Sequence, residues 1–137
     1  MKRIVAIDFG IKRIGIAISD NGQTIAFPLA TVSGGNNAVL NIKNALKEKL
    51  PDVERILVGF PVLLSGKEGD MAILVKKFAQ TLEEAFALPV ELIDERFTSR
   101  LADQHLREIH LNRKERTAKL DTAAAAILLQ AYLDGLK

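Results

Sequence analysis

Residues 3–19 read Arg-Ile-Val-Ala-Ile-Asp-Phe-Gly-Ile-Lys-Arg-Ile-Gly-Ile-Ala-Ile-Ser, and this stretch decides the fold. Residues 3–8 are apolar on both faces, which is typical of a strand inside a sheet that is covered on both sides. Residues 13–19 alternate isoleucine with Gly, Ala and Ser, which is the period-2 pattern of a second strand. The short link over residues 10–12 predicts that a hairpin joins the two strands.

The hydrophobic pattern changes from strand-like to helical as the chain continues. A third strand is expected over residues 24–32, and Pro28 within it favours an edge position because proline cannot donate to a neighbouring strand. From about residue 37 the apolar side chains recur at helical spacing. The further elements expected are helices over 37–50, 70–86, 98–109 and 118–134, and strands over 54–60 and 90–93. In the second of these helices we expect Asp70 as the cap and a buried stripe of Met71, Leu74, Val75, Phe78, Leu82 and Phe86.

The resulting order is βββ-α-β-α-β-α-α. Strands joined by short links should be antiparallel, and strands entered through helices should be parallel. This combination predicts an α/β protein of the ribonuclease H-like fold, with a mixed five-stranded sheet between helices. An ordinary doubly wound sheet would need a helix after its first strand, and none fits between Asp8 and Arg13. No repeat or linker divides residues 1–137, so we expect a single domain.

The composition excludes several classes of protein. The chain has 137 residues and no cysteine, which excludes disulfide scaffolds, zinc ribbons and thiol catalysis. Its longest apolar runs are far shorter than the roughly 20 residues of a membrane span. Lys2 and Arg3 precede an apolar stretch, but Asp8 interrupts that stretch, so it does not read as a secretion signal. We expect a cytoplasmic protein with no membrane partner.

The formal net charge of +2 conceals an uneven distribution of charge. Residues 1–50 hold seven Lys or Arg against three Asp or Glu, and residues 96–119 hold the same numbers. Residues 51–95 are acidic, with four against nine. Two basic segments can provide a surface for phosphate groups, although solvated faces would give the same pattern.

Three carboxylates occupy positions where a charge is costly. Asp8 ends a strand that is otherwise buried, Glu95 follows the fifth strand, and Asp121 heads a helical stripe that contains Ala124, Ala125, Leu128 and Tyr132. A buried carboxylate must be paired, protonated or bound to a cation. Each has a structural alternative: Asp8 can accept backbone N–H bonds in the hairpin turn, Glu95 can occupy a strand-to-helix turn as acidic residues commonly do, and Asp121 can equally well begin a helix. Only one of Asp94 and Glu95 should point toward Asp8, because neighbouring side chains alternate.

Together these residues would form a set of oxygen ligands without His or Cys. Such a set selects Mg²⁺ or Mn²⁺ over zinc. Two such ions, about 4 Å apart, can support phosphodiester hydrolysis. Three converging carboxylates would repel one another without cations, so we expect dependence on a divalent metal, with two ions present when substrate is bound.

Four blocks of the sequence are similar to those of the YqgF (RuvX) family. The first is Asp8-Phe9-Gly10-Ile11-Lys12-Arg13-Ile14-Gly15, and the second is Gly59-Phe60-Pro61 with Gly66 downstream. The third is Asp94-Glu95-Arg96-Phe97-Thr98-Ser99, and the fourth begins at Leu120-Asp121-Thr122-Ala123-Ala124 and extends to Asp134. The blocks occur in order over essentially the whole chain. Two departures are mild: Ala6 replaces a frequent glycine, and Leu64-Ser65 replaces a Met-Asp-like pair.

The resemblance implies a ribonuclease H-like nuclease with Asp8, Glu95 and Asp121 as the metal-binding catalytic acids. It further implies a structural role for the motif residues Gly10, Gly15, Gly59, Pro61, Gly66 and Thr98. The family is linked to maturation of the 5′ end of pre-16S ribosomal RNA and, by fold analogy, to resolution of Holliday junctions.

Basic residues near these blocks are candidates for contacts with substrate phosphates. They are Lys12, Arg13, Arg96, Arg100, Arg113, Lys114, Arg116 and Lys119. The run 112–119 directly precedes Asp121, and we expect it to form a mobile basic loop. Aromatic residues are only 5% of the chain, with no Trp, so recognition by base stacking is disfavoured. Shape and backbone recognition is expected instead.

These observations lead to a metal-dependent hydrolase that cuts structured RNA in ribosome biogenesis, with ribosomal precursor particles as partners. One alternative is a junction resolvase acting on branched DNA, which would need two active sites and hence a homodimer; the sequence does not decide between monomer and dimer. Another is a noncatalytic RNA-binding assembly factor. An actin-like ATPase is disfavoured because 137 residues leave no second lobe to enclose a nucleotide.

Overall fold

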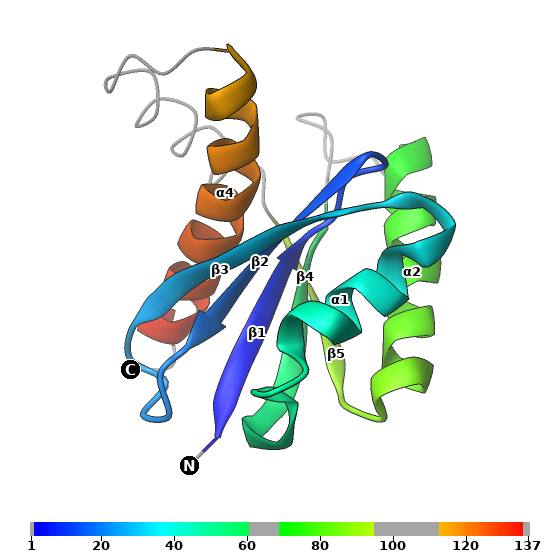
Figure 1. The fold of residues 1–137 in the computed structure, drawn as a ribbon. Helices are drawn as coiled ribbons and strands as arrows, with labels where there is room; N and C mark the ends of the chain where they lie inside the picture. The colour runs from blue at the N-terminus through cyan, green and yellow to red at the C-terminus, as the bar shows by residue number, and fades with distance from the viewer. Residues whose placement is uncertain (1, 61–68, 95–112, 136–137) are drawn as a thin grey trace.

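The computed structural model describes residues 2–60, 69–94 and 113–135, with backbone alone for Phe60, Asp94 and residues 113–122 (Figure 1). Five strands form one sheet in the order β3-β2-β1-β4-β5. Strand β1 is therefore central, as its apolar sequence predicts. The strands are β1 (Arg3–Asp8), β2 (Arg13–Ser19), β3 (Ala26–Ser33), β4 (Val53–Phe60) and β5 (Val90–Asp94).

The first three strands form an antiparallel meander, as expected. Strand β1 pairs with β2, with Asp8 opposite Gly15, and β2 pairs with β3. Strand β3 lies at the edge of the sheet, which confirms the position indicated by Pro28. Gly10 makes the first turn possible, because a Cβ atom there would lie 2.3 Å from the carbonyl oxygen of Arg13.

The last two strands are parallel to β1, which confirms the mixed sheet. Strand β4 pairs with β1, with Ile7 opposite Val58, and β5 pairs with β4, with Phe60 opposite Asp94. The carboxyl ends of β1, β4 and β5 consequently meet at one edge of the sheet. This edge is where α/β proteins place their chemistry.

Helices cover both faces of the sheet (Figure 1). Helices α1 (Ala38–Leu46) and α2 (Asp70–Phe86) cover one face, and α4 (Arg113–Gly135) covers the other. Within the described ranges, none of the helices has the length and apolar character that a membrane span requires. The helix expected over residues 98–109 lies outside the described residues.

Alternation along β1 divides the core into two clusters. Val5 and Ile7 pack with α1 and α2, whereas Ile4 and Ala6 pack with α4. On the α4 side, Ala6 and Ala17 face a helix whose buried residues are Ala124, Ala125, Leu128, Leu129 and Leu133. Small side chains on both surfaces allow the helix to approach the sheet closely. Each of the buried leucines contributes roughly 1.5–3 kcal/mol.

The helix boundaries and faces differ in part from those expected. Helix α1 is shorter than residues 37–50, with a 3₁₀ turn on either side of it. Gly69 rather than Asp70 is the N-cap of α2, and Asp70 makes no capping bond. Leu74, expected on the buried stripe of α2, is 44% exposed. The buried face of the helix is instead formed by Ala72, Val75, Ala79, Leu82 and Phe86, which also recur at helical spacing.

Ser19 is the buried polar residue of the described core, and its hydroxyl joins the ends of β1 and β2. The Oγ accepts a hydrogen bond from the Ile4 amide at 2.8 Å and donates one to the Asp20 carbonyl at 2.9 Å. Nearby, the Arg3 guanidinium donates to the Ser19 carbonyl at 3.1 Å. The pair of bonds secures the start of β1 while its far end carries Asp8.

We predict that Ser19→Ala destabilises the protein by about 1–3 kcal/mol, because the buried Ile4 amide loses its acceptor. Urea unfolding followed by circular dichroism measures the change. The exposed Ser33 provides the control, since Ser33→Ala should alter the free energy of unfolding by less than about 0.5 kcal/mol. Equal effects of the two substitutions would contradict the role given to the Ser19 hydroxyl.

Candidate active site at the carboxyl ends of the parallel strands

Asp8 is the last residue of β1, and its side chain is half-buried. Because Ile4 and Ala6 face α4, strand alternation places Asp8 on the same face of the sheet. Gly15 lies opposite Asp8 across the hairpin and is itself buried. Residues directly opposite in an antiparallel pair share a face, so Gly15 brings no side chain against the Asp8 carboxylate.

Close backbone contacts hold the turn that follows Asp8. The Gly34 amide donates a hydrogen bond of 2.9 Å to the Lys12 carbonyl. A Cβ atom on Gly34 would lie 2.3 Å from the Ile11 carbonyl oxygen, so only glycine permits this approach. On the other side of the turn, the Phe9 ring packs on Phe78 of α2 with centroids 4.6 Å apart. The backbone around Asp8 is thus fixed from two directions.

Asp121 lies within α4, four residues before Ala125. Residues spaced by four share one helical face, and Ala125 packs in the same cluster as Ala6 of β1. The helix runs antiparallel to β1, so position 121 lies about 6 Å beyond Ala125 toward the carboxyl edge of the sheet. Positions 8 and 121 therefore lie at the same end of the interface between β1 and α4.

Two polar contacts fix the position of α4 at the other end of the sheet. The Gln130 amide accepts a hydrogen bond from the Ala26 amide and donates one to the Thr24 carbonyl, both at 2.9 Å. The Tyr132 hydroxyl accepts a hydrogen bond of 2.8 Å from the Arg55 guanidinium. Tyr132 and then Glu91 raise the pKa of Arg55 above its ordinary value, which keeps this cation charged. These contacts fix the position of α4 along the sheet, and they therefore also fix the position of residue 121 in the helix backbone.

Glu95 lies outside the described residues, and so does the side chain of Asp94. The described part of β5 shows which of its side chains point to which face of the sheet. Ile93 packs with the cluster on the α4 side, whereas Val90 packs with the cluster on the other side. Odd-numbered positions of β5 thus share the face on which Asp8 lies.

The structure describes several of the predicted phosphate-binding residues. Lys12 and Arg13 are exposed on the hairpin next to Asp8. The expectation of a loop over 112–119 is wrong for 113–119, because α4 begins at Arg113. Arg, Lys, Glu and Ala are strong helix formers, and no Gly or Pro interrupts the helix before Gly135. The backbones of Arg113, Lys114, Arg116 and Lys119 are therefore helical, and Arg96 and Arg100 lie outside the described residues.

The glycines of the motifs have distinct structural roles. Gly10 permits the hairpin turn, Gly15 lies opposite Asp8 and adds no side chain there, and Gly59 is buried in β4 opposite Ile93. Pro61, Gly66 and Thr98 lie outside the described residues. Two residues that position the site, Gly34 and Gln130, were not predicted from the sequence. The Gly34-Gly35 pair directly after a predicted strand could have indicated Gly34. No sequence pattern indicates the contacts of Gln130.

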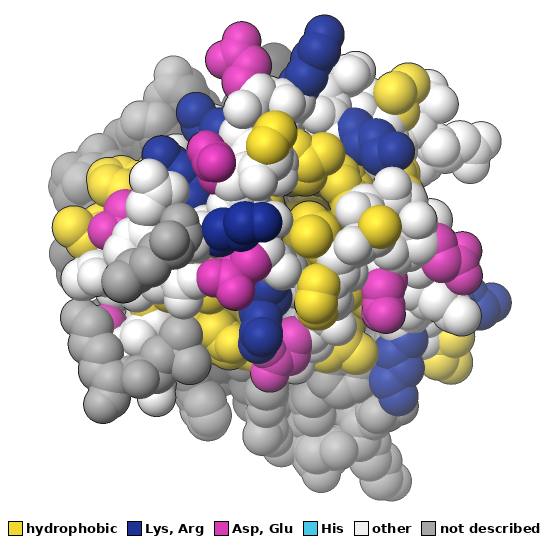
Figure 2. All heavy atoms as spheres, turned by 90° about the horizontal axis from the view of Figure 1, so that it is seen from below, with side chains coloured by type: hydrophobic (Ala, Val, Ile, Leu, Met, Phe, Trp, Pro, Cys, Tyr) yellow, Lys and Arg dark blue, Asp and Glu magenta, His cyan; other side chains and the backbone are white. Residues whose placement is uncertain are grey.

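The opposite end of the molecule has a different distribution of charge. Viewed from that end, acidic and basic side chains alternate across the described part of the surface (Figure 2). Arg55 and Glu91 form an ion pair of 3.2 Å here, with both side chains partly exposed. Such mixed surfaces give little attraction for a polyanion.

The donors at the carboxyl edge suit a hard cation. The half-buried Asp8 offers carboxylate oxygens, and Gly15, opposite it in the hairpin, adds no side chain beside them. Within the side chains that the structure describes, no group of three or more acids or histidines converges. Asp8 alone of the three predicted acids has a described side chain.

Known proteins of one family match this chain over nearly its full length. The family model described as "RuvX: Holliday junction resolvase" matches residues 2–135. A protein of Protochlamydia amoebophila named "Putative pre-16S rRNA nuclease" is 40% identical, with 96% of this chain and 93% of that protein aligned. A protein of the same name from Bacteroides thetaiotaomicron is 42% identical, with 98% and 97% aligned.

Solved structures confirm the ribonuclease H-like fold. The Fowlpox virus resolvase, solved with Holliday junction DNA, has a TM-score of 0.61 at 17% identity, covering 98% of both chains. RuvC of T. thermophilus, also solved with a Holliday junction, has a TM-score of 0.55 at 16% identity, covering 99% of this chain and 96% of that one. From the family model and the close relatives, the chain belongs to the RuvX family of Holliday junction resolvase-like nucleases.

Proposed function

We propose that this chain is a metal-dependent nuclease that hydrolyses phosphodiester bonds of structured RNA, in processing the 5′ end of pre-16S ribosomal RNA. The observation that supports the proposal is that Asp8 ends β1 at the same end of the β1–α4 interface as helix position 121. Relatives of nearly the same length, at 40% and 42% identity, bear a name with this activity.

The residues proposed to hold Mg²⁺ or Mn²⁺ are Asp8, Glu95 and Asp121. Glu95 is the residue directly after β5, in which Ile93 packs on the α4 side, the side on which Asp8 lies. All three residues offer carboxylate oxygens, which these cations prefer. When bound, two such cations activate a water and stabilise the leaving oxygen of a phosphodiester.

The residues of the chain itself orient the reaction and bind the substrate. The fixed turn after Asp8 holds one carboxylate at the end of a central strand, so little reorganisation is needed during catalysis. Lys12 and Arg13, together with the basic first turns of α4, would neutralise the phosphates on either side of the scissile bond.

A second candidate function is resolution of four-way DNA junctions, which the description of the matching family favours. Symmetric cleavage of a junction requires two active sites and therefore a dimer. A noncatalytic RNA-binding role in ribosome assembly is the third possibility. Cleavage and binding of an RNA and a junction substrate distinguish these three functions.

We predict that Asp8→Asn lowers the cleavage rate of a precursor rRNA fragment by at least about 100-fold in Mn²⁺, because it removes a charged oxygen ligand. The measurement compares that fragment with a synthetic four-way DNA junction, using the wild-type chain and the variant. Asp52→Asn is the control, since Asp52 is an exposed acid in a 3₁₀ turn before β4, at the amino end of that strand.

The control should retain the wild-type rate. Cleavage of the junction by a dimer, with the RNA left intact, would favour the resolvase. Binding of RNA without metal-dependent cleavage of either substrate would refute the nuclease and support the assembly role.

We predict that replacing Arg113, Lys114 and Arg116 together with Ala weakens RNA binding and reduces its salt dependence. Loss of three phosphate contacts should lower the slope of log K against log salt by about 2–3. Fluorescence anisotropy over a salt series gives this slope. The double substitution of the exposed Lys2 and Lys77 is the control and should leave the slope within about 0.5 of the wild-type value. An unaltered slope in the triple variant would reject a role for the start of α4 in binding.

A further inference from the structure

A shallow groove runs along the outer edge of the sheet, between β3 and α1. It consists of two adjoining hollows, of about 470 Å³ and about 230 Å³, that share Asn44 and Ala45. The first hollow lies between Ser33 of β3 and Asn41 of α1, and the second extends past Leu29 to Lys47 and Lys49. The motifs of the catalytic site do not involve these residues.

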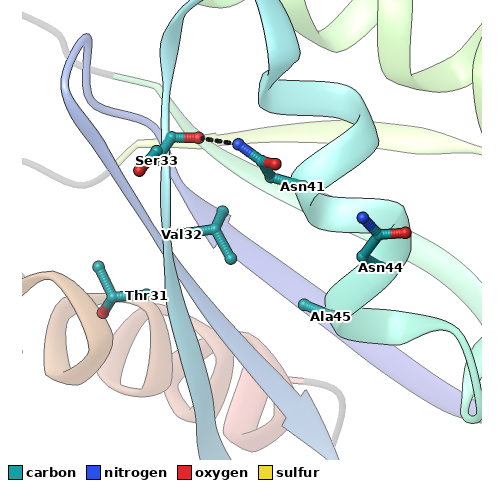
Figure 3. A pocket seen from close by; sticks show the side chains of 6 residues that line it. All are labelled: Thr31, Val32, Ser33, Asn41, Asn44 and Ala45. Atoms are coloured by element: carbon teal, nitrogen blue, oxygen red, sulfur yellow. Dashed lines mark hydrogen bonds between the residues drawn. The ribbon is translucent and has the colours of Figure 1, made fainter.

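The walls of the groove combine apolar and polar groups. In Figure 3 the Val32 side chain points toward α1, while Thr31 points to the other face of the strand and borders the groove through its backbone. An edge strand leaves every second pair of its N–H and C=O groups without a partner strand. On the helix, the Asn41 amide donates a hydrogen bond of 2.9 Å to the Ser33 carbonyl. The exposed Asn44 amide makes no hydrogen bond within the described part of the chain.

The charges around the groove suit a polyanion. From residue 21 to residue 47 the sequence contains no Asp or Glu, and of its two lysines Lys47 lines the groove, whereas Lys43 lies over the Phe86 ring of α2. Lys47 and Lys49 line the lower end of the groove, where Glu48 is the single acid among its lining residues. Amides, backbone N–H groups and lysines are the groups that contact sugar and phosphate in nucleic-acid complexes.

The groove begins beside the β1–β2 hairpin, close to the carboxyl edge of the sheet. Ser33, at its upper end, pairs with Arg13, and the next residue, Gly34, donates its amide proton to the Lys12 carbonyl. Strand β3 is two strand spacings, or about 10 Å, from β1. From Ser33 to Leu29 the groove follows the strand for roughly 13 Å away from that edge. The groove opens on the α1 face of the sheet, whereas Asp8 shares the α4 face, so a strand from the catalytic site would cross over the β1–β2 hairpin to reach it.

We propose that this groove binds a single-stranded extension of the RNA substrate through its sugar–phosphate backbone, while the cleavage site lies at the carboxyl edge. The proposal rests on the nuclease function proposed above and adds a substrate feature to it. The lining residues include no aromatic ring, so the contacts are to the backbone and independent of base identity. Addition of a protein strand to β3 is disfavoured, because α1 borders this edge and Pro28 has no N–H to donate.

The test compares binding of two RNAs in EDTA, which prevents cleavage. One RNA is a blunt stem, and the other is the same stem with a single-stranded extension of about ten nucleotides, placed on the 5′ or the 3′ end. The groove variant carries Asn44→Asp and Lys47→Glu. The matched control carries Lys77→Glu and Gln80→Glu, which make the same change in charge at the same spacing on exposed positions of α2. Thermal unfolding and cleavage of the blunt stem in Mn²⁺ are measured for each protein.

We expect the extension to strengthen binding by the wild-type chain. In the groove variant this gain in affinity should be roughly tenfold smaller, because about two phosphate contacts are lost. The control should keep the gain, and all three proteins should bind the blunt stem alike. Because the chain has no cysteine, Asn44→Cys also allows a single dye to be attached. A quencher on the free end of the extension should then quench this dye, whereas one on the stem should not.

Several outcomes would overturn the proposal. A full gain in the groove variant, or an equal loss in the groove variant and the control, would show that the groove does not hold the extension. A dimer in sedimentation that the groove substitutions dissociate, with the gain unaltered, would instead assign this face to a second copy of the chain. Metal-dependent cleavage without any gain from the extension would leave the nuclease standing and reject the groove. A gain that depends on the groove, without cleavage of any RNA, would support the groove and refute the nuclease.

Discussion

The close packing of α4 on β1 is the constraint on which the rest of the structure depends. Strand β1 is buried on both faces, and on one of them Ala6 meets a helix that presents Ala124 and Ala125. Larger side chains at this contact would push the helix outward and separate position 121 from Asp8 at the end of the strand. The Gln130 and Tyr132 contacts at the far end prevent the helix from sliding. The packing of the core therefore also determines the geometry of the site. Small residues at the centre of the interface set the distance between helix and sheet, and polar contacts at one end set the position of the helix along it.

The division of charge follows from the same arrangement. Carboxylates at the end of a central strand require cations, and a polyanionic substrate requires basic residues around them. The hairpin beside Asp8 carries Lys12 and Arg13, and the first turns of α4 carry four more basic residues. The face at the opposite end mixes both signs of charge, and the groove along β3 lacks acids over most of its length. A small net charge of +2 therefore coexists with regions suited to phosphate.

Much of the fold could be predicted from residues 3–19, because burial on both faces of β1 and a link too short for a helix restrict the topology strongly. The edge position of β3 followed from Pro28, and the parallel strands followed from the intervening helices. Local details were harder. Leu74 and Ala72 each fit a helical stripe with Val75 and Leu82, and the pattern alone does not decide which of the two is buried. The basic run before Asp121 read as a loop, although its residues are good helix formers. The groove and the Gln130 contacts join segments far apart in the chain, so no local pattern predicts them.

The most direct test of the account is the effect of Mn²⁺ on thermal stability in the wild-type chain and in Asp121→Asn. Converging carboxylates repel one another without a cation, so the substitution should raise the melting temperature in EDTA. It should also abolish most of the increase that saturating Mn²⁺ gives the wild-type chain, since binding to the folded state alone is what stabilises it. If Asp121→Asn instead leaves the melting temperature in EDTA unaltered and responds to Mn²⁺ as the wild-type chain does, Asp121 is not part of a cation site with Asp8, and the account fails.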